Sequence, residues 1–405
     1  LINVDIDRLL VVDQDIRNLT QEIDKLKNER NKLSSSIPNL SDDKKKNTIN
    51  YVKDLKEKIS ALEEKLNPLK EEYKNLMYEV PGVPLEEVPI GKTDEDNVEI
   101  KRVGEIPKFN FKIKDHVELA EDLDLIDIPR GVKISGSRSY FLKNEALLLE
   151  MALCRYVVDK LVKKGFTPMG VPVLVKEDAM YGTSYFPGGR EQTYTMNDDN
   201  LYLVGTSEVA LVSYHSGETF DSPECLPKMY CGYSNCFRRE AGTYGKDTHG
   251  LYRVHQFTKI EQVILCEADF DKQYELHNFL LSNAEEIMQE LKIPYRVVKV
   301  CTGDMGVGQI RKHDIEAWMP SRNKYSETHS CSSFGDFQAR RSNIKYKDKD
   351  GATKYCFSLN NTAIASPRIL IPLLELNQNE DGSINIPEVL IPYMGGMKKI
   401  EKKNK

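Results

Sequence analysis

The chain has 405 residues, of which 30% are charged, with a formal net charge of −6 and eight cysteines. Because a single core rarely grows beyond ~250–300 residues, we expect two or three domains. No apolar run approaches the ~20 residues that a membrane-spanning helix requires, so we exclude an integral helical membrane protein. The negative charge excludes a uniformly basic nucleic-acid coat, although it leaves room for a local basic patch.

The cysteines form no Cys-x-x-Cys pair, and the spacing of Cys225, Cys231 and Cys236 does not match a zinc site. A chain of this length does not need a disulfide framework, so we interpret the cysteines as reduced thiols. The first residues lack the basic-then-apolar order of a signal peptide. We expect an incomplete N-terminus and a cytoplasmic protein, with an organellar matrix as the alternative.

The first 80 residues carry two apolar seams at heptad spacing, over residues 9–33 and 52–76. Each seam alternates steps of three and four residues, which keeps one helix face against a partner helix. The seams have equal lengths and are separated by a polar connector that contains Pro38. We therefore predict an antiparallel two-helix coiled coil over residues 1–80, kinked at Pro68.

Charge is unevenly distributed along this hairpin. Residues 25–58 hold ten lysines or arginines and five acids, a net charge of +5, whereas the rest of 1–80 has a net charge of −6. A basic tip on a protruding rod suits a phosphate backbone. A coiled coil whose charges only keep it soluble would show the same pattern, so both interpretations stay open.

The rest of the chain mixes helices and strands. We interpret residues 81–105, rich in Val, Pro, Gly and acids, as an ordered linker, and residues 398–405 as a charged, disordered tail. Strands that follow one another without intervening helices favour an antiparallel sheet, so residues 106–397 are expected to form an α+β domain. The expected helices cover residues 144–164, 271–291 and 366–376. The expected strands cover residues 201–204, 229–233, 236–239, 256–265, 295–300 and 358–359.

Charged residues stand inside two of these apolar strands. Arg238 and Glu240 would share one face of the first, and Arg253, Phe257 and Glu261 one face of its partner. Arginine binds phosphate or carboxylate through two parallel hydrogen bonds, and an aromatic ring can stack on a base. No Rossmann or P-loop motif occurs, and none of the seven histidines has a partner at metal-ligand spacing. A buried ion-pair network on the sheet is the structural alternative.

Residues 238–248 followed by 253–257 resemble motif 2 of class II aminoacyl-tRNA synthetases, and the seryl-tRNA synthetase family in particular. The resemblance extends over about residues 5–395. Helix 144–164 with Pro172 resembles motif 1, which forms the dimer interface, and residues 360–368 resemble motif 3. Residues 206–208 match the family's Thr-x-Glu, and residues 327–333 and 336–341 match its ATP-binding stretch. The N-terminal hairpin matches the family's tRNA-binding arm.

The resemblance implies a homodimeric serine–tRNA ligase that activates L-serine with ATP and transfers the seryl group to tRNA(Ser). It implies three catalytic residues, Arg238, Glu240 and Arg368. The arginines would hold the ATP phosphates, Phe257 and Arg368 would enclose adenine, and Glu240 would read the adenine amino group. Attack of the serine carboxylate on the α-phosphate needs positioning and charge neutralisation, which explains why no catalytic Ser, Cys or His is evident.

The resemblance also implies the remaining contacts. The other ATP-binding residues would be Arg239, Val254, Glu327, Thr328, His329 and Ser330, with Glu327 and Ser330 also near Mg²⁺. The serine-binding residues would be Thr206, Ser207, Glu208, Arg238, Glu261 and Thr362. The tRNA-binding residues would be Lys25, Lys27, Arg30, Lys32, Lys53 and Lys56.

Two features depart from the family pattern. The short segment that precedes the arm in the family is missing, and Asn361 replaces a glycine of motif 3, which could alter the packing of the pocket. Two alternatives stay open. A non-catalytic paralogue could bind tRNA as a scaffold or regulator, although Arg238, Glu240, Glu261 and Arg368 argue against it. An enzyme with the same core could instead load another small amino acid or a carrier protein.

Overall fold

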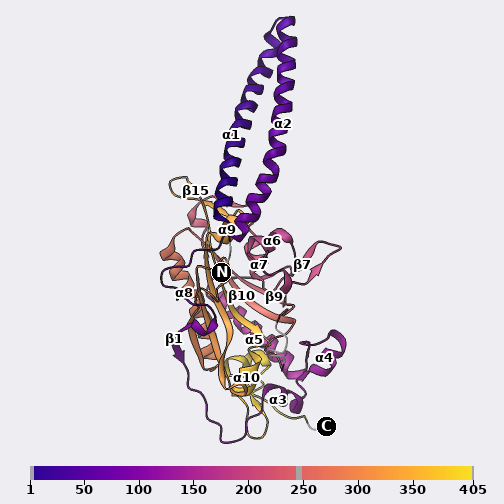
Figure 1. Ribbon diagram of the computed structural model, residues 1–405. Coiled ribbons are helices and arrows are strands. Elements are labelled where there is room, and N and C mark those ends of the chain that lie inside the picture. The colour runs from indigo at the N-terminus through magenta and orange to yellow at the C-terminus, as the bar shows by residue number, and fades with distance from the viewer. Residues whose placement is uncertain (1–3, 243–248, 404–405) are drawn as a thin grey trace. The chain divides into compact units, whose positions relative to one another are not determined.

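The computed structural model describes residues 4–242 and 249–403 and divides into two compact units, Leu1–Pro81 and Gly82–Lys405 (Figure 1). Residues 243–248 of the predicted motif 2 lie outside the described residues. No helix within the described ranges is both long and apolar enough to cross a bilayer. All eight cysteines are free thiols.

The first unit is a pair of long helices, α1 (Ile6–Ser36) and α2 (Asp42–Glu79), joined by a 3-10 turn at Ile37–Asn39. Arg8 near the start of α1 binds Glu72 near the end of α2 at 2.6 Å, so the helices run antiparallel, as predicted. The buried seam contains Leu9, Val12, Ile23, Leu55, Ile59 and Leu66. Helix α2 continues past Pro68 to Glu79.

The second unit is built on an eight-stranded sheet with the order β1-β11-β12-β13-β16-β10-β9-β4. Every neighbouring pair is antiparallel except β4 and β9, which confirms the predicted α+β fold. The strands are β1 (Val98–Val103), β4 (Thr167–Gly170), β9 (Lys228–Phe237), β10 (Gln256–Cys266), β11 (Tyr295–Lys299), β12 (Arg311–Met319), β13 (Lys324–Gly335) and β16 (Phe357–Ser366).

Helices α5 (Asn144–Lys163), α8 (Phe270–Glu290) and α10 (Leu370–Leu376) bury apolar side chains in one core with the sheet. Leu149, Leu280 and Leu374, one from each helix, are at most 2% exposed. The remaining elements are α3 (His116–Leu123), α4 (Ile128–Ser135), α6 (Glu177–Gly182), α7 (Glu208–Ser213), α9 (Phe337–Ser342), 3-10 turns at Asp94–Asp96, Arg190–Gln192, Pro223–Cys225, Pro320–Arg322 and Glu388–Met394, and small strands β2 (Ile126–Asp127), β3 (Phe141–Leu142), β5 (Leu174–Lys176), β6 (Thr195–Met196), β7 (Leu201–Leu203), β8 (Thr219–Phe220), β14 (Lys345–Lys347), β15 (Thr353–Tyr355), β17 (Ile384–Asn385) and β18 (Lys399–Ile400).

The charged residues of motif 2 do not lie within a strand, contrary to the prediction. Residues 229–233 and 236–239 belong to one strand, β9, which ends at Phe237. Glu240 has a φ of 52°, and this left-handed conformation is incompatible with a continuing strand. The return strand β10 begins at Gln256, as in the expected range 256–265, so Arg253 lies before the strand and not within it. Arg238 and Glu240 therefore reach the site from a turn beyond β9.

Three further boundaries differ from expectation. Residues 98–103 of the expected linker pair with β11 as an edge strand, so the linker belongs to the second unit. Helix α10 begins at Leu370 because Ser366 ends β16 and precedes Pro367, which disfavours helical backbone before it. The tail is not wholly disordered, since β18 pairs with β17 and buries Ile400.

Candidate active site

Two adjoining cavities lie along β10 and its neighbours. The first, called the arginine cavity, is lined by residues that include Arg238, Arg253 and Arg368. The second, called the carboxylate cavity, is lined by residues that include Glu208 and Glu261. The cavities share Arg238, Lys259, Glu327 and Thr362. A ligand that fills both would therefore pass directly beside the Arg238 guanidinium group.

Strand pairing brings residues of both cavities together from distant parts of the sequence. On β10, Phe257 is paired with Cys236 of β9, and Glu261 is paired with Thr362 of β16. Phe257 lines the arginine cavity and Glu261 the carboxylate cavity, while Lys259 between them lines both. This arrangement confirms the prediction that alternate residues of this strand present one polar face.

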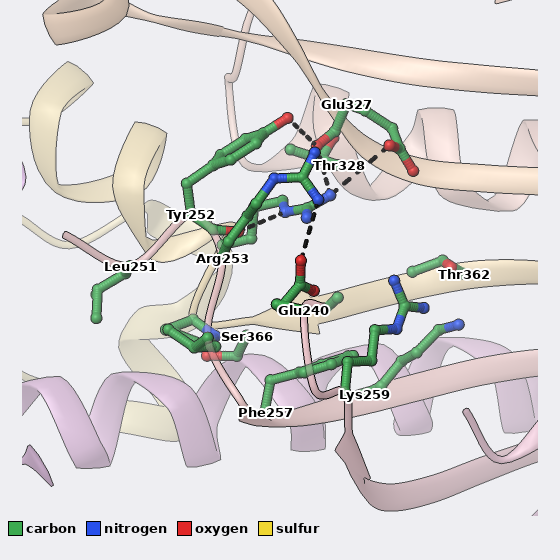
Figure 2. Close-up of a pocket in the computed structure, with 15 residues that line it drawn as sticks. Glu240, Leu251, Tyr252, Arg253, Phe257, Lys259, Glu327, Thr328, Thr362 and Ser366 are labelled. Carbon is green, nitrogen blue, oxygen red and sulfur yellow. Dashed lines mark hydrogen bonds and ion pairs between the residues drawn. The ribbon is translucent and has the colours of Figure 1, made fainter. Parts of the chain in front are cut away.

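Three arginines, Arg238, Arg253 and Arg368, line the arginine cavity. Figure 2 shows Arg253 close to Glu240 in this cavity. The Cζ of Arg238 lies 5.3 Å from the centre of the Phe257 ring. Arg253 binds Glu240 at 3.2 Å. The Cζ of Arg368 lies 4.3 Å from the Tyr252 ring. Its Nε donates to the Tyr252 carbonyl and its Nη1 to the Glu327 carbonyl, each at 3.1 Å. A cavity with fixed arginines and a flat aromatic ring suits a polyanion that carries a base.

Glu327 lines both cavities, and Ser330 lines the carboxylate cavity. Burial would raise the pKa of Glu327, but the charges of Arg368 and then Lys312 outweigh it and hold that pKa below its usual value. Burial and the Glu327 charge raise the pKa of Asp314 to about 7, although Lys312 opposes the shift. Ser330 is the β13 partner of Asp314. Oxygen donors of this kind are those that Mg²⁺ prefers.

No group of three or more His, Cys, Asp or Glu side chains within residues 4–242 and 249–403 could hold a metal ion by itself. Glu327 and Ser330 together offer fewer protein ligands than an octahedral ion requires. Mg²⁺ is commonly bound by one or two carboxylates together with substrate phosphates. The donor set thus fits an ion that arrives with a phosphate ligand.

The carboxylate cavity combines acids, an ammonium group and hydroxyls. Glu261 forms an ion pair with Lys259 and accepts a hydrogen bond from Thr362 Oγ1 at 3.4 Å. Lys259 Nζ also donates to Thr206 Oγ1 at 3.1 Å. Glu208 accepts hydrogen bonds from Gln338 Nε2 at 2.7 Å and from the Tyr185 hydroxyl at 3.3 Å. Such a pocket can complement a small ligand that carries both an ammonium and a hydroxyl group.

Glu208 offers a test of this electrostatic environment. Burial, together with the charge of Glu261, raises the pKa of Glu208 to about 7. The folded state therefore favours the protonated form, and this stabilisation is complete below the ordinary pKa of 4.5 and lost as the pH rises to about 7. It amounts to at most about 3 kcal/mol. We expect Glu208→Gln to reduce the fall in unfolding free energy over this range, measured by urea unfolding. An unchanged pH profile would contradict this assignment.

Most of the residues predicted for the site line the two cavities. Arg238, Glu240, Val254, Phe257, Glu327, Thr328, Thr362 and Arg368 line the arginine cavity, and Glu208, Glu261 and Ser330 line the carboxylate cavity.

Four predicted residues are not among the cavity-lining residues. Arg239 Nη1 donates to the Glu191 carbonyl at 3.2 Å. His329 is buried and contacts the Ala363 carbonyl at 3.1 Å. Ser207 Oγ donates to the Gly232 carbonyl at 3.4 Å. Thr206 Oγ1 accepts a hydrogen bond from Lys259 Nζ at 3.1 Å, so its hydroxyl is bonded to a residue that lines the cavities. These side chains would act through neighbouring residues rather than by direct contact with a ligand.

Several lining residues were missing from the predicted set. Lys259 and Arg253 belong to the polar face that the strand pattern indicated, so their type and spacing could have identified them. Tyr185 and Lys312 come from other segments and carry no comparable local signal. Asn361, expected to alter the pocket, bonds instead to Gln262 at 2.7 Å and to the Ser330 carbonyl at 3.3 Å. Its neighbours Asn360 and Thr362 line the carboxylate cavity, because side chains alternate along β16.

The basic residues of the first unit are mostly exposed on the two helices. Lys25, Lys32, Lys53 and Lys56 are exposed, and Arg30 is half-buried. Lys27 forms an ion pair with Glu63 at 2.7 Å, so part of its charge is already used within the hairpin.

Comparison with known proteins relates both units to one family. The model of the class II tRNA synthetase core domain (G, H, P, S and T) matches residues 192–377, and that of the seryl-tRNA synthetase N-terminal domain matches residues 2–84. The chain is 48% identical to the serine–tRNA ligase of Deinococcus radiodurans, over 80% of this chain and 76% of that protein. It is 49% identical to the Treponema denticola enzyme, over 78% and 75% of the two chains.

Solved structures agree with these relatives. The seryl-tRNA synthetase of Pyrococcus horikoshii, complexed with ATP, has a TM-score of 0.87 and 38% identity, covering 98% of this chain and 94% of that one. The cytoplasmic serine–tRNA ligase of Naegleria fowleri, in complex with AMP, has a TM-score of 0.84 and 31% identity, covering 98% and 92%. Because the family models match both units and the relatives are 48–49% identical over more than three quarters of this chain, the chain belongs to the seryl-tRNA synthetase family of class II aminoacyl-tRNA synthetases.

Proposed function

We propose that the chain is a serine–tRNA ligase that activates L-serine with ATP to seryl-adenylate and pyrophosphate, and then transfers the seryl group to the 3′-terminal ribose of tRNA(Ser). The observation that carries the proposal is that the arginine cavity and the carboxylate cavity meet at Arg238. A nucleotide in the first and an amino acid in the second would have their reacting groups beside the same guanidinium group.

The arginine cavity would bind ATP. The Phe257 ring would stack on adenine with Arg368 on the opposite side, and Glu240 would accept a hydrogen bond from the adenine amino group. Arg238 and Arg368 would neutralise the phosphates. Adenylate formation moves negative charge from the α-phosphate to pyrophosphate, so fixed cations that need no reorganisation accelerate it.

Glu327 and Ser330 would hold Mg²⁺ together with ATP oxygens. When bound, the ion would neutralise phosphate charge. Support for this role comes from the lowered pKa of Glu327, which keeps its carboxylate ionised. Glu327 also lies 3.8 Å from Arg368. The carboxylate would therefore bind the metal ion, and the guanidinium group would bind a phosphate of the same ATP molecule.

The carboxylate cavity would bind serine. Glu261 would accept the ammonium group, Arg238 would face the carboxylate, and Thr362 and Glu208 would bond to the hydroxyl. An amino acid without that hydroxyl would leave buried polar groups unpaired. The free-energy cost of these unpaired groups would make the pocket reject such an amino acid more strongly than an apolar pocket could. The structure of the pocket thus favours serine over another small amino acid.

Other surfaces of the chain support proposals for its partners. We place tRNA(Ser) on the basic residues of the arm, where most lysines are exposed. We place a second copy of the chain against α5 of motif 1, where Leu147, Leu148 and Met151 are 44–61% exposed on one helix face. Large exposed apolar patches of this kind mark protein interfaces. Eight free thiols suit the reducing cytoplasm, as they would an organellar matrix.

A serine-dependent ATP–pyrophosphate exchange assay tests the proposal. We expect exchange with serine, and a loss of at least about 100-fold in kcat/KM with alanine or glycine. Threonine, which adds a methyl group, is the discriminating competitor. No exchange with any amino acid would favour a tRNA-binding paralogue without catalysis, and better exchange with another amino acid would overturn the specificity.

A further inference from the structure

His116, at the start of α3, is buried outside both cavities and bonded on both sides of its ring. Its Nδ1 lies 2.8 Å from Glu375 Oε1, and its Nε2 accepts the backbone N–H of Leu251 at 3.2 Å. Because an N–H donates to Nε2, that nitrogen carries no proton, and the Nδ1–H donates to Glu375. The ring therefore has one defined tautomer and one defined orientation.

Glu375, on α10, holds the ring in that orientation. Its side chain is fully buried and accepts three further hydrogen bonds, from the backbone N–H of His116 and from the N–H and hydroxyl of Ser321, at 2.7–3.1 Å. A carboxylate in such a position is tolerated because its hydrogen-bonding capacity is satisfied. Helix α10, which begins two residues after Arg368, is thus tied to the start of α3.

Leu251 belongs to a short segment that leads into β10 and borders the arginine cavity. Leu251, Tyr252 and Arg253 all line that cavity, as Figure 2 shows. The carbonyl of Tyr252 accepts from Arg368 Nε, and the Tyr252 ring lies under the Arg368 guanidinium group. A shift of Leu251 would therefore move the residue that orients Arg368.

Gly250 shows how closely this segment passes the histidine. Its φ of +70° is a conformation that favours glycine, and a Cβ at this position would lie only 2.0 Å from His116 Nε2. Both features require the absence of a side chain. A second contact, from His249 Nε2 to Asp115 at 3.0 Å, ties the same segment to the N-terminus of α3.

We propose that His116, oriented by Glu375, is a positioning residue that holds the backbone of residues 250–252 so that Tyr252 presents Arg368 to ATP. The inference rests on the proposed function, since ATP in the arginine cavity is itself a proposal. His116 acts through the Leu251 amide and contacts no substrate.

Two substitutions at His116 separate the role of each ring nitrogen. In His116→Asn the side-chain amide can still donate to Glu375 but cannot reach Leu251. In His116→Gln the longer side chain can place its carbonyl oxygen near the position of Nε2 and accept the Leu251 N–H. We expect His116→Asn to raise the KM for ATP in the exchange assay by about tenfold, and His116→Gln by no more than about threefold. The KM for serine should stay near its wild-type value in both.

His215→Asn is the matched control for lost stability. His215 is also buried, with Glu218 at Nδ1 and the Tyr230 hydroxyl at Nε2, each at 2.7 Å, and it lines neither cavity. Its replacement should lower the Tm without changing the KM for ATP. Gly250→Ala would place a methyl group against His116 Nε2 and so disturb the same contact from the side of residues 250–252. This variant should also raise the KM for ATP.

The outcomes distinguish this inference from the proposed function. If wild-type exchange is normal, an unchanged KM for ATP in His116→Asn or Gly250→Ala overturns the positioning role, and so does an equal rise in His116→Gln or His215→Asn. If the wild-type protein catalyses no serine-dependent exchange, the proposed function itself fails, and the inference fails with it.

Discussion

Replacement of Arg238 by alanine is expected to lower serine-dependent ATP–pyrophosphate exchange by about 10³-fold, which is the effect of removing a cation from a phosphoryl-transfer site. Arg238 lines both cavities, so its loss removes the group that both substrates would share. Binding of tRNA should change little, because the proposed tRNA contacts lie in the other structural unit. The exchange rate and a filter-binding titration with tRNA(Ser) measure the two effects separately.

Arg102→Ala provides the matched control. The Arg102 guanidinium group lies 5.1 Å from the Tyr325 ring and binds Glu99, so it has an aromatic and a carboxylate neighbour much as the site arginines do. It lies on the edge strand β1 and lines neither cavity. The ATP–pyrophosphate exchange rate of the Arg102→Ala variant should match that of the wild type. Comparable turnover in Arg238→Ala would remove Arg238 from the phosphate site.

Deletion of residues 25–58 is expected to abolish charging of tRNA(Ser) while exchange remains close to wild type. The deletion removes the basic part of the hairpin, with its net charge of +5, and leaves the second unit intact. Ile23 and Ile59 belong to one apolar cluster, so a short Gly-Ser linker can rejoin the two shortened helices near that contact. Aminoacylation and exchange, measured on the same preparation, distinguish the two steps.

A charge variant separates electrostatic contact from a mere loss of length. Replacing Lys25, Lys32, Lys53 and Lys56 by glutamine removes exposed charges and keeps both helices. This variant should weaken tRNA binding and reduce its dependence on salt. If the deletion variant still charges tRNA, the arm is not the tRNA-binding element. If the glutamine variant binds normally, the charges of the arm only keep the hairpin soluble.

Periodic patterns in the sequence predicted the features that depend on local order. The heptad seams predicted the antiparallel hairpin because each apolar stripe must be buried against a partner helix, and the equal lengths and short polar connector favour pairing of the two helices with each other. Strand alternation placed Phe257, Lys259 and Glu261 on one side of β10, and the helices at 144–163 and 270–290 were predicted within one residue at each end. In these cases each residue's position follows from its neighbours along the chain.

Turns and edges were predicted less well, for physical reasons. The strand pattern could not anticipate the left-handed Glu240, which ends the extended conformation and directs the motif 2 charges into the cavity from a turn. Nor could it anticipate that residues 98–103 would find a partner in β11, about 200 residues away. Pairing of this kind depends on which edge is free once the sheet has formed.

By itself the sequence determined the two-helix arm, the polar face of β10 and the residue types of the motifs, since these depend on spacing and on chemistry carried along the chain. Only the tertiary structure decided which of these residues meet. It placed Arg238 between two cavities, buried Glu208 near enough to Glu261 for that charge to help raise the pKa of Glu208, and joined His116 to Leu251 across more than 130 residues. Those relations depend on distances and on exclusion of water, which arise when distant segments pack together.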